Sequence, residues 1–176
     1  MDFFELIERR RSVRRFDGRQ VPEEYIARML KAALLAPSSK NSRSSSFMVV
    51  DDPGLLESIS VMRDFGSAFL KDTPLGIVVM GDESVTDLWV DNAAISATYL
   101  QLAAEALGLG SCWVHVNGRQ RKKDDHAAGS AEDYLKTFLP VPKGRRILCV
   151  IAAGYPSPGN SARREDPDIG ALVIRL

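Results

Sequence analysis

The sequence predicts a single domain in which helices pack against a β-sheet, of either the α+β or the α/β class. Four short apolar runs typical of strands alternate with helical segments, and an extended arm follows the last of them. A length of 176 residues suits one compact core, and no repeat or linker divides the chain. We therefore expect one domain that covers residues 1–176.

Helices are predicted where apolar residues recur at helical spacing between start and stop signals. Asp2 is expected to cap a short helix that leads into a run of arginines. Pro22 suits the first position of a second helix, and Pro37 ends it because the residue before a proline avoids helical geometry. Gly108 or Gly110 is expected to cap the longest helix. The remaining helices are predicted over residues 53–64, 85–110 and 131–139.

Strands are predicted where short apolar runs are rich in β-branched residues. The four runs cover residues 46–50, 75–80, 111–116 and 145–154. The polar stretch 117–130 is expected to be an exposed loop, and the tail is rich in proline and glycine until a last apolar run over residues 171–174. Such a terminal segment, with little to pack against in its own chain, is typical of an arm that lies on a partner subunit.

Composition narrows the class of protein. The 23 basic residues are balanced by 23 acidic ones, which argues against a nucleic-acid partner. Cys112 and Cys149 lie in apolar runs and are expected to be buried free thiols. The first residues mix acidic with apolar side chains, unlike a signal peptide, and no apolar run is long enough to span a bilayer. We therefore expect a cytoplasmic protein without a membrane partner.

The first candidate site is a cluster of five arginines around one serine within residues 8–16. In an extended backbone Arg10, Ser12 and Arg14 face one way, while the residues between them face the other. Arginine forms bidentate pairs with phosphate, and the serine adds a hydroxyl donor. The pattern indicates a phosphate clamp. A solvated basic loop or a nucleic-acid patch remains an alternative at this point.

Other stretches are weaker signals. Residues 36–47 crowd hydroxyl and amide groups into a loop between a helix and a strand, which is also common turn chemistry. The glycines of residues 108–113 follow a helix and precede a strand, which is the reverse of a dinucleotide-binding fingerprint. Cys112 and His115 are expected on opposite faces of a strand, so they do not form a thiol–imidazole pair. The sequence shows no metal-ligand spacing and no serine-hydrolase elbow.

Four stretches together resemble the nitroreductase-like family of oxidoreductases that use flavin mononucleotide (FMN). They are RRSVRRF (10–16), APSSKNS (36–42), ALGLGSCWV (106–114) and AAGYP (152–156), and their order matches along nearly the whole chain. The resemblance is to a short member of the family. It implies an α+β fold, an α-β-α sandwich around a central mixed sheet. It also implies an intertwined homodimer with an exchanged C-terminal arm and FMN at the subunit interface.

The resemblance also implies which residues bind the flavin. Those matching the phosphate site are Arg10, Ser12 and Arg14, joined by Arg163 or Arg164 from the tail, and Arg11 occupies a neighbouring contact position. Those matching the loop that reaches the ring from the partner subunit are Pro37, Ser38, Ser39 and Asn41. Those whose main chain passes the ring are Cys112, Trp113 and Val114, and the backbone near His115 would donate to flavin N5.

The implied reaction is a ping-pong hydride transfer. NAD(P)H reduces the flavin, and an electron-poor acceptor such as a nitroaromatic or a quinone then reoxidises it. The flavin carries the chemistry, and no catalytic side chain is assigned. Two alternatives stay open: a specialised flavoprotein for dehalogenation, flavin cleavage or dehydrogenation, and a non-catalytic protein that binds an anion or nucleic acid. Residues 43–45 depart from the usual Gln-Pro-Trp of the family, so the substrate and the choice between NADH and NADPH stay open.

Overall fold

Four strands form the central sheet of the computed structural model, which describes residues 2–159, 170 and 173–174. Their order across the sheet is β1-β2-β6-β3. The strands are β1 (Ser45–Val50), β2 (Leu75–Asp82), β3 (Gly110–His115) and β6 (Arg145–Gly154). Each of the three pairings is antiparallel. The expectation of a mixed sheet was therefore wrong for these strands: within the described residues, the parallel contact is an isolated bridge between Ser12 and Ser111.

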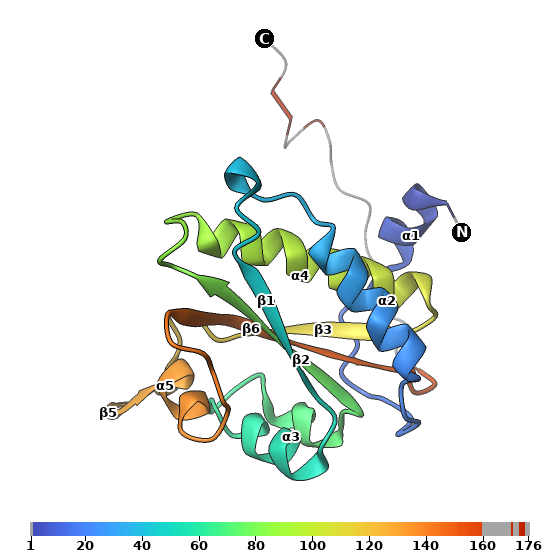
Figure 1. Cartoon of the computed structure of the whole chain (residues 1–176). Helices are drawn as coiled ribbons and strands as arrows, with labels where there is room; N and C mark the ends of the chain where they lie inside the picture. Colours follow the sequence, from blue (N-terminus) through green and yellow to red (C-terminus); the bar gives the residue numbers. More distant parts are fainter. Residues whose placement is uncertain (1, 160–169, 171–172, 175–176) are drawn as a thin grey trace.

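Helices cover both faces of this sheet (Figure 1). On one face lie α2 (Glu23–Leu34) and α4 (Trp89–Ala106). On the other lie α3 (Pro53–Ser60) and α5 (Ala131–Lys136). The short α1 (Phe3–Arg9) lies outside this sandwich, and the 3-10 turns are η1 (Ser39–Asn41) and η2 (Ala68–Asp72). The predicted α-β-α sandwich is confirmed.

The sheet separates two apolar clusters because side chains alternate along its strands. In β2, Ile77 and Val79 pack toward α2 and α4, whereas Val78 and Met80 pack toward α3 and α5. The central strand β6 is buried on both faces from Ile147 onward. This burial of apolar surface is the main force that joins the three layers, and it explains why the central strands read as continuous apolar runs.

Several predicted boundaries agree with the structure. Asp2 accepts a hydrogen bond from the main-chain N–H of Glu5 at 2.9 Å, as expected of a helix cap. Gly108, with a φ of 76°, adopts the left-handed conformation after α4, so it is the capping glycine. The helices predicted over residues 53–64 and 131–139 end earlier, at Ser60 and Lys136.

The prediction of a loop over residues 117–130 was wrong. This stretch forms a hairpin of β4 (Gln120–Lys122) and β5 (Asp125–Ser130). The hairpin has no apolar alternation in its sequence because both of its faces are largely exposed. The side chain of Asp64 holds it to the loop after α3 by accepting a hydrogen bond from the main-chain N–H of Lys123 at 2.9 Å.

Candidate functional site

The arginine segment runs beside the edge strand β3. The main-chain N–H of Val13 donates to the carbonyl of Ser111 at 2.9 Å. The Val13 side chain is buried over Gly110, where an added Cβ would lie 2.7 Å from the Cβ of Val13. A glycine is therefore required at residue 110, because any side chain would push the segment away from the strand.

The arginines of this segment divide between two sides. Arg10 and Arg14 both lie near enough to Cys112 for their charges to lower the pKa of its thiol, against the larger effect of burial. Arg11 instead donates to the carbonyls of Glu8 and Arg10, and it lines a separate hollow of about 290 Å³ together with Val13. This is the alternation that the sequence predicted. It groups Arg10 with Arg14 and leaves Arg11 on the other side.

Arg10 and Arg14 have no carboxylate partner among the residues that the structure describes. Arg9, in contrast, pairs with Glu5 at 3.7 Å and with Glu105 at 3.5 Å. Arg14 and the neighbouring Ser12 are exposed. The segment therefore presents two cations and a hydroxyl that can bind an anion. Arg163 and Arg164, predicted to join them, lie outside the described residues.

The serine-rich loop before β1 is held in an unusual conformation. Lys40, Asn41 and Arg43 have φ values of 49°, 52° and 48°, in the left-handed region that non-glycine residues rarely adopt. Such residues cost on the order of 1–3 kcal/mol each and cluster at ligand sites. Strain of this kind persists only where the surrounding structure enforces it.

Asn92, in the first turn of α4, holds the serine-rich loop in this conformation. The Asn92 side chain is 1% exposed, and its Oδ1 accepts from the main-chain N–H of Ser39 at 2.8 Å. Its Nδ2 lies within hydrogen-bonding distance of three hydroxyls, those of Ser39, Ser42 and Ser44. We did not identify Asn92 from the sequence, because α4 carries several other polar residues, among them a second buried amide, Gln101. The network also shows that Ser44, one of the residues that depart from the family pattern, points into the protein.

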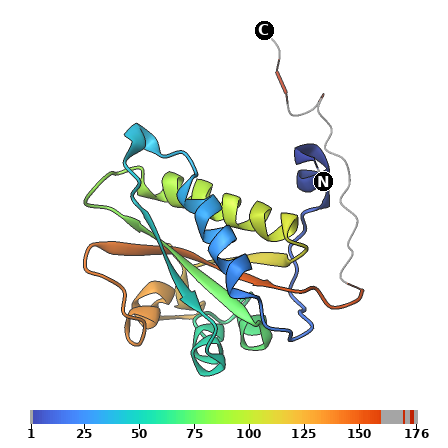
Figure 2. The ribbon, with the colours of Figure 1, turned by 45° about the vertical axis from the view of Figure 1, so that its right-hand side comes forward.

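One chain does not bring the two predicted regions together. Asn92 holds the serine-rich loop at the start of α4, whereas Glu105 meets Arg9 at the end of that helix. At 1.5 Å per residue, these two anchor points lie roughly 20 Å apart. Figures 1 and 2 show η1 and the arginine segment after α1 at opposite ends of α4 from both directions. Within one chain the two regions are therefore separate.

The predicted ring-facing strand β3 has one open edge. The carbonyl of Ser111 accepts from Val13, and that of His115 accepts from the Arg63 guanidinium at 2.9 Å. Because main-chain groups of alternate residues point to the same edge, the N–H groups of Trp113 and His115 also face outward. No described residue is a partner for either N–H.

The side chains of β3 point to both faces of the sheet. Cys112 and Val114 are buried toward α3 and α5, whereas Trp113 packs on the opposite cluster. The Trp113 indole N–H donates to Nδ1 of His115 at 3.2 Å, so His115 shares the face of Trp113 and is separated from Cys112, as predicted. Burial raises the pKa of the Cys112 thiol despite nearby Arg14 and Arg10, so this cysteine is no activated nucleophile.

Positive charge gathers at the end of β3. Burial lowers the pKa of His115, and Arg119 and Arg63 lower it further. Burial and Arg119 likewise lower the pKa of Arg63. Sequence reasoning missed Arg63, because an arginine in a polar loop between a helix and a strand carries no signal of its own.

The described part of the chain holds no group of three or more His, Cys, Asp or Glu residues that could bind a metal ion. Among these same residues, no helix combines the length and the apolar character needed to cross a membrane.

Comparison with known proteins identifies the family. The Nitroreductase family profile matches residues 7–88 and 56–155. A solved FMN-dependent nitroreductase from Clostridium difficile R20291 is 36% identical, with a TM-score of 0.89 over 99% of this chain and 98% of its own. A relative from Methanothermobacter thermautotrophicus, whose name joins NADH dehydrogenase with NAD(P)H nitroreductase, is 34% identical over 96% of this chain and 85% of its own.

A third relative has a different name. Iodotyrosine deiodinase 1 of Sus scrofa is 41% identical and aligns with 89% of this chain, which spans 62% of the deiodinase. The family predicted from four short sequence stretches is thus confirmed: the chain belongs to the Nitroreductase family.

Proposed function

We propose that this protein is an FMN-dependent oxidoreductase that takes hydride from NAD(P)H and passes it to an electron-poor acceptor such as a nitroaromatic or a quinone. The observation that carries the proposal is the pair Arg10 and Arg14, which lack carboxylate partners in the described chain and lie beside the open edge of β3. The FMN-dependent nitroreductase at a TM-score of 0.89 supports this reading.

The residues present fit FMN. A phosphate monoester carries close to two negative charges near neutral pH, which suits Arg10, Arg14 and the hydroxyl of Ser12. Each charge-assisted hydrogen bond of this kind contributes about 1.5–3 kcal/mol. The outward N–H groups of Trp113 and His115 would donate to the flavin ring.

The flavin supplies the redox chemistry when it is bound, by accepting and then releasing a hydride. The protein orients the ring along β3 and supplies positive charge from Arg63, which favours an anionic reduced ring. We assign no side chain as a general acid or base. The expected role of this chain is positioning and electrostatic stabilisation.

We further propose that two copies of the chain form the site. Pro37, Ser38, Ser39 and Asn41 would reach the ring from the partner, because within one chain the serine-rich loop lies at the far end of α4 from the arginine segment. Exposed apolar residues support such a contact: Leu34 and Leu35 at the end of α2 and Ile95 and Tyr99 on α4. An apolar patch of this kind is typical of a protein interface.

An absorbance spectrum of the purified protein tests the proposal. We expect a yellow protein whose flavin bands bleach anaerobically on addition of NADH or NADPH and return when a quinone is added. Light scattering after size exclusion should give a dimer. A colourless protein that does not take up added FMN would overturn the proposal.

Reductive dehalogenation is a second candidate, favoured by the 41% identity to a deiodinase. The discriminating measurement is iodide release from 3-iodotyrosine by the dithionite-reduced protein. Rapid iodide release together with bound flavin that NAD(P)H does not bleach would favour this function over the first.

A further inference from the structure

A basic pocket lies beyond the end of β3. Its volume is about 510 Å³, and it lies between the loop after α3 and the β4–β5 hairpin. Its main lining side chains are Arg63, Asp64, Phe65, Arg119, Arg121 and Lys123. Neither the predicted site residues nor the proposed flavin contacts, apart from Arg63, belong to this pocket.

Within the described residues, the positive charge of the pocket is only partly balanced, by one carboxylate against four cations. None of its four cations forms an ion pair in the described part of the chain, where the ion pairs involve other cations. The single carboxylate of the lining, that of Asp64, accepts a hydrogen bond from the main-chain N–H of Lys123 and so serves to hold the hairpin. Four cations beside a single carboxylate still repel one another, and a bound anion would relieve this repulsion.

Two of the cations are already fixed in place. The Arg63 guanidinium donates to the carbonyls of Phe65 and His115 at 2.8 Å and 2.9 Å. Arg121 lies 4.0 Å from the centre of the Tyr134 ring. Fixed guanidinium groups lose less conformational freedom when they bind a ligand.

The other two cations and one aromatic ring are open to solvent. Arg119 and Lys123 are exposed, and no side-chain hydrogen bond or ion pair is found for them within the described residues. Phe65 is 74% exposed at the pocket wall. A cluster of arginines beside an exposed aromatic ring suits an organic phosphate that carries a planar ring, because the ring can stack while the phosphate pairs with guanidinium.

We propose that this pocket binds an organic phosphate on the molecule that exchanges hydride with the flavin. The proposal rests on the proposed function, because Arg63 joins the pocket to His115 at the strand edge where the flavin ring would lie. Two sources share this chemistry: the 2′-phosphate of NADPH and the phosphate of a phosphorylated acceptor.

Binding of a nucleotide fragment tests the pocket without turnover. Calorimetry would compare adenosine 2′,5′-bisphosphate with 5′-AMP on the purified, flavin-loaded parent and on an Arg119→Gln/Lys123→Gln variant. Both substituted side chains are exposed, so the variant should fold normally. The matched control is Lys71→Gln/Lys143→Gln, which removes two exposed charges outside the pocket.

We expect the bisphosphate to bind the parent at least 10-fold more tightly than 5′-AMP, and the pocket variant to lose that advantage. Raising the salt concentration should weaken binding to the parent more than to the variant. Equal affinity of the parent and the pocket variant for the bisphosphate, or an equal loss in the control, would overturn the proposal.

Two kinetic ratios identify the source of the phosphate. A 10-fold or larger fall of the NADPH-to-NADH ratio of kcat/KM in the pocket variant assigns the pocket to the reductant. A similar fall of the ratio for free FMN over riboflavin as acceptors assigns it to the acceptor. If neither ratio changes, the pocket does not serve the reaction and the proposal fails.

These results separate the pocket from the proposed function. A protein that binds no flavin refutes the proposed function, whereas the dependence of bisphosphate binding on Arg119 and Lys123 can still be measured on that protein. A flavin enzyme with unchanged bisphosphate binding refutes the pocket alone.

Discussion

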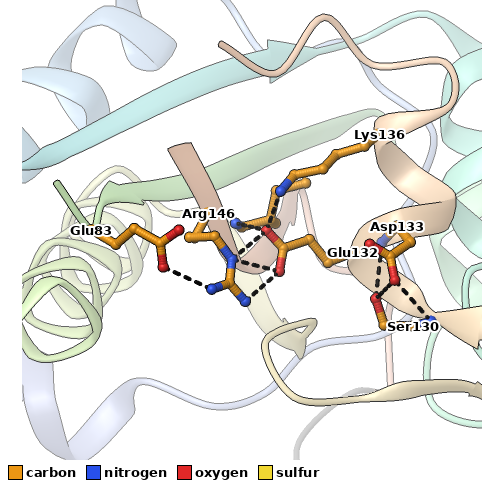
Figure 3. Close-up of polar contacts among 7 residues, drawn as sticks. Glu83, Ser130, Glu132, Asp133, Lys136 and Arg146 are labelled. Atoms are coloured by element: carbon orange, nitrogen blue, oxygen red, sulfur yellow. Dashed lines mark hydrogen bonds and ion pairs between the residues drawn. The ribbon is translucent and has the colours of Figure 1, made fainter. Parts of the chain in front are cut away.

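Two arginine-containing clusters of this protein differ in how their charge is balanced. Arg146 on β6 donates to both carboxylate oxygens of Glu132 at 3.0 Å and to Glu83 at 2.9 Å (Figure 3). Lys136 lies 2.7 Å from Glu132, and the main-chain N–H of Ile147 donates to the same carboxylate. The basic pocket beyond β3 has four cations, and no described residue forms an ion pair with any of them.

The balanced cluster serves the fold. Burial opposes ionisation of Glu132, but hydrogen bonds from Arg146, Lys136 and Ile147 outweigh it and lower the pKa of this carboxyl. The pKa of Arg146 is raised, chiefly by its hydrogen bond to Glu132. The cluster joins the first turn of α5 to β6, next to the capping box of Ser130 and Asp133 (Figure 3). Charges satisfied by their own chain stabilise that chain, and charges left open are available to ligands.

The largest effect is expected from Glu132→Gln. The change removes the buried carboxylate that holds Arg146, Lys136 and the main chain of Ile147, and leaves Arg146 with Glu83 alone. We expect a loss of about 3 kcal/mol in the free energy of unfolding. For a chain of this size the melting temperature should fall by about 6–12 °C. Thermal denaturation by circular dichroism is the measurement. The exposed Glu57→Gln is the control, and an unchanged melting temperature for Glu132→Gln would contradict a structural role.

The stability of the protein at acidic pH gives a second test of the Glu132–Arg146 cluster. The pKa of Glu132 is lower in the folded state than its usual 4.5, so its contribution to stability is present above that value and is lost as the pH falls through the folded pKa. As the pH falls from about 5 to about 3, the parent should therefore lose more stability than Glu132→Gln does. Urea denaturation at each pH measures this difference, and parallel curves would contradict it.

Replacing Arg10 and Arg14, which have no carboxylate partner among the described residues, should weaken FMN binding and leave the fold intact. For Arg10→Gln/Arg14→Gln we expect the affinity for FMN to fall on the order of 100-fold, because two charge-assisted hydrogen bonds of about 1.5 kcal/mol each are lost. The melting temperature of the flavin-free protein should stay within about 2 °C of the parent, because Arg14 is exposed, Arg10 is half-buried and neither has a carboxylate partner in the described residues.

Fluorescence titration with FMN measures the affinity, with Lys71→Gln/Lys143→Gln as the control for the change in net charge. Retention of parental affinity by the double arginine variant would refute the phosphate assignment. A matching loss in the control would show that the effect comes from net charge and not from these two residues.

A smaller effect is expected from Asn92→Ala. This change removes the buried amide that holds Ser39, Ser42 and Ser44, and we expect a loss of about 2 kcal/mol in stability. Hydrogen exchange over residues 38–45 should become faster, because the serine-rich loop would lose its hydrogen bonds to Asn92 and keep those within itself and to Asp82 and Arg145. The control is Thr98→Ala, an exposed change on the same helix, and unchanged exchange would contradict the role of Asn92.

The smallest effect concerns His115. Arg119 is, after burial, the main cause of its lowered pKa, so Arg119→Gln should raise that pKa toward 6.5. A titration followed by nuclear magnetic resonance measures it, and Lys71→Gln should leave it unchanged. A pKa that stays the same or falls would show that the pocket cations do not act on the end of β3.

Much of the fold could be predicted from the sequence because its signals are local. The four central strands are apolar runs, Asp2 and Gly108 mark helix ends, and Pro37 follows a helix as expected. The β4–β5 hairpin could not be predicted, because its strands are polar and exposed and its position depends on the side chain of Asp64. The antiparallel pairing of the central strands could not be predicted either, because the apolar sequence of a buried strand does not indicate the direction of its neighbours.

Part of the candidate site could likewise be predicted from the sequence, and part of it could not. The alternation of Arg10, Ser12 and Arg14 follows from the two-residue period of extended chain, and the sequence was enough to predict it. Asn92 and Arg63 act on residues about 50 positions away, so only the tertiary structure could reveal them. The exchanged arm and Arg163 or Arg164 stay predictions, since they lie outside the described residues.

The sequence by itself determined the periodicity, the caps and the family, because these depend on neighbours along the chain. Only the tertiary structure decided which arginines are neutralised and which are open, because a counter-charge comes from a distant element. Arg146 meets Glu132 and Glu83 across the fold, whereas no described residue does the same for Arg119. The sequence shows where the arginines are. The tertiary structure decides whether each one forms an ion pair within the chain and stabilises the fold, or stays available to bind a ligand.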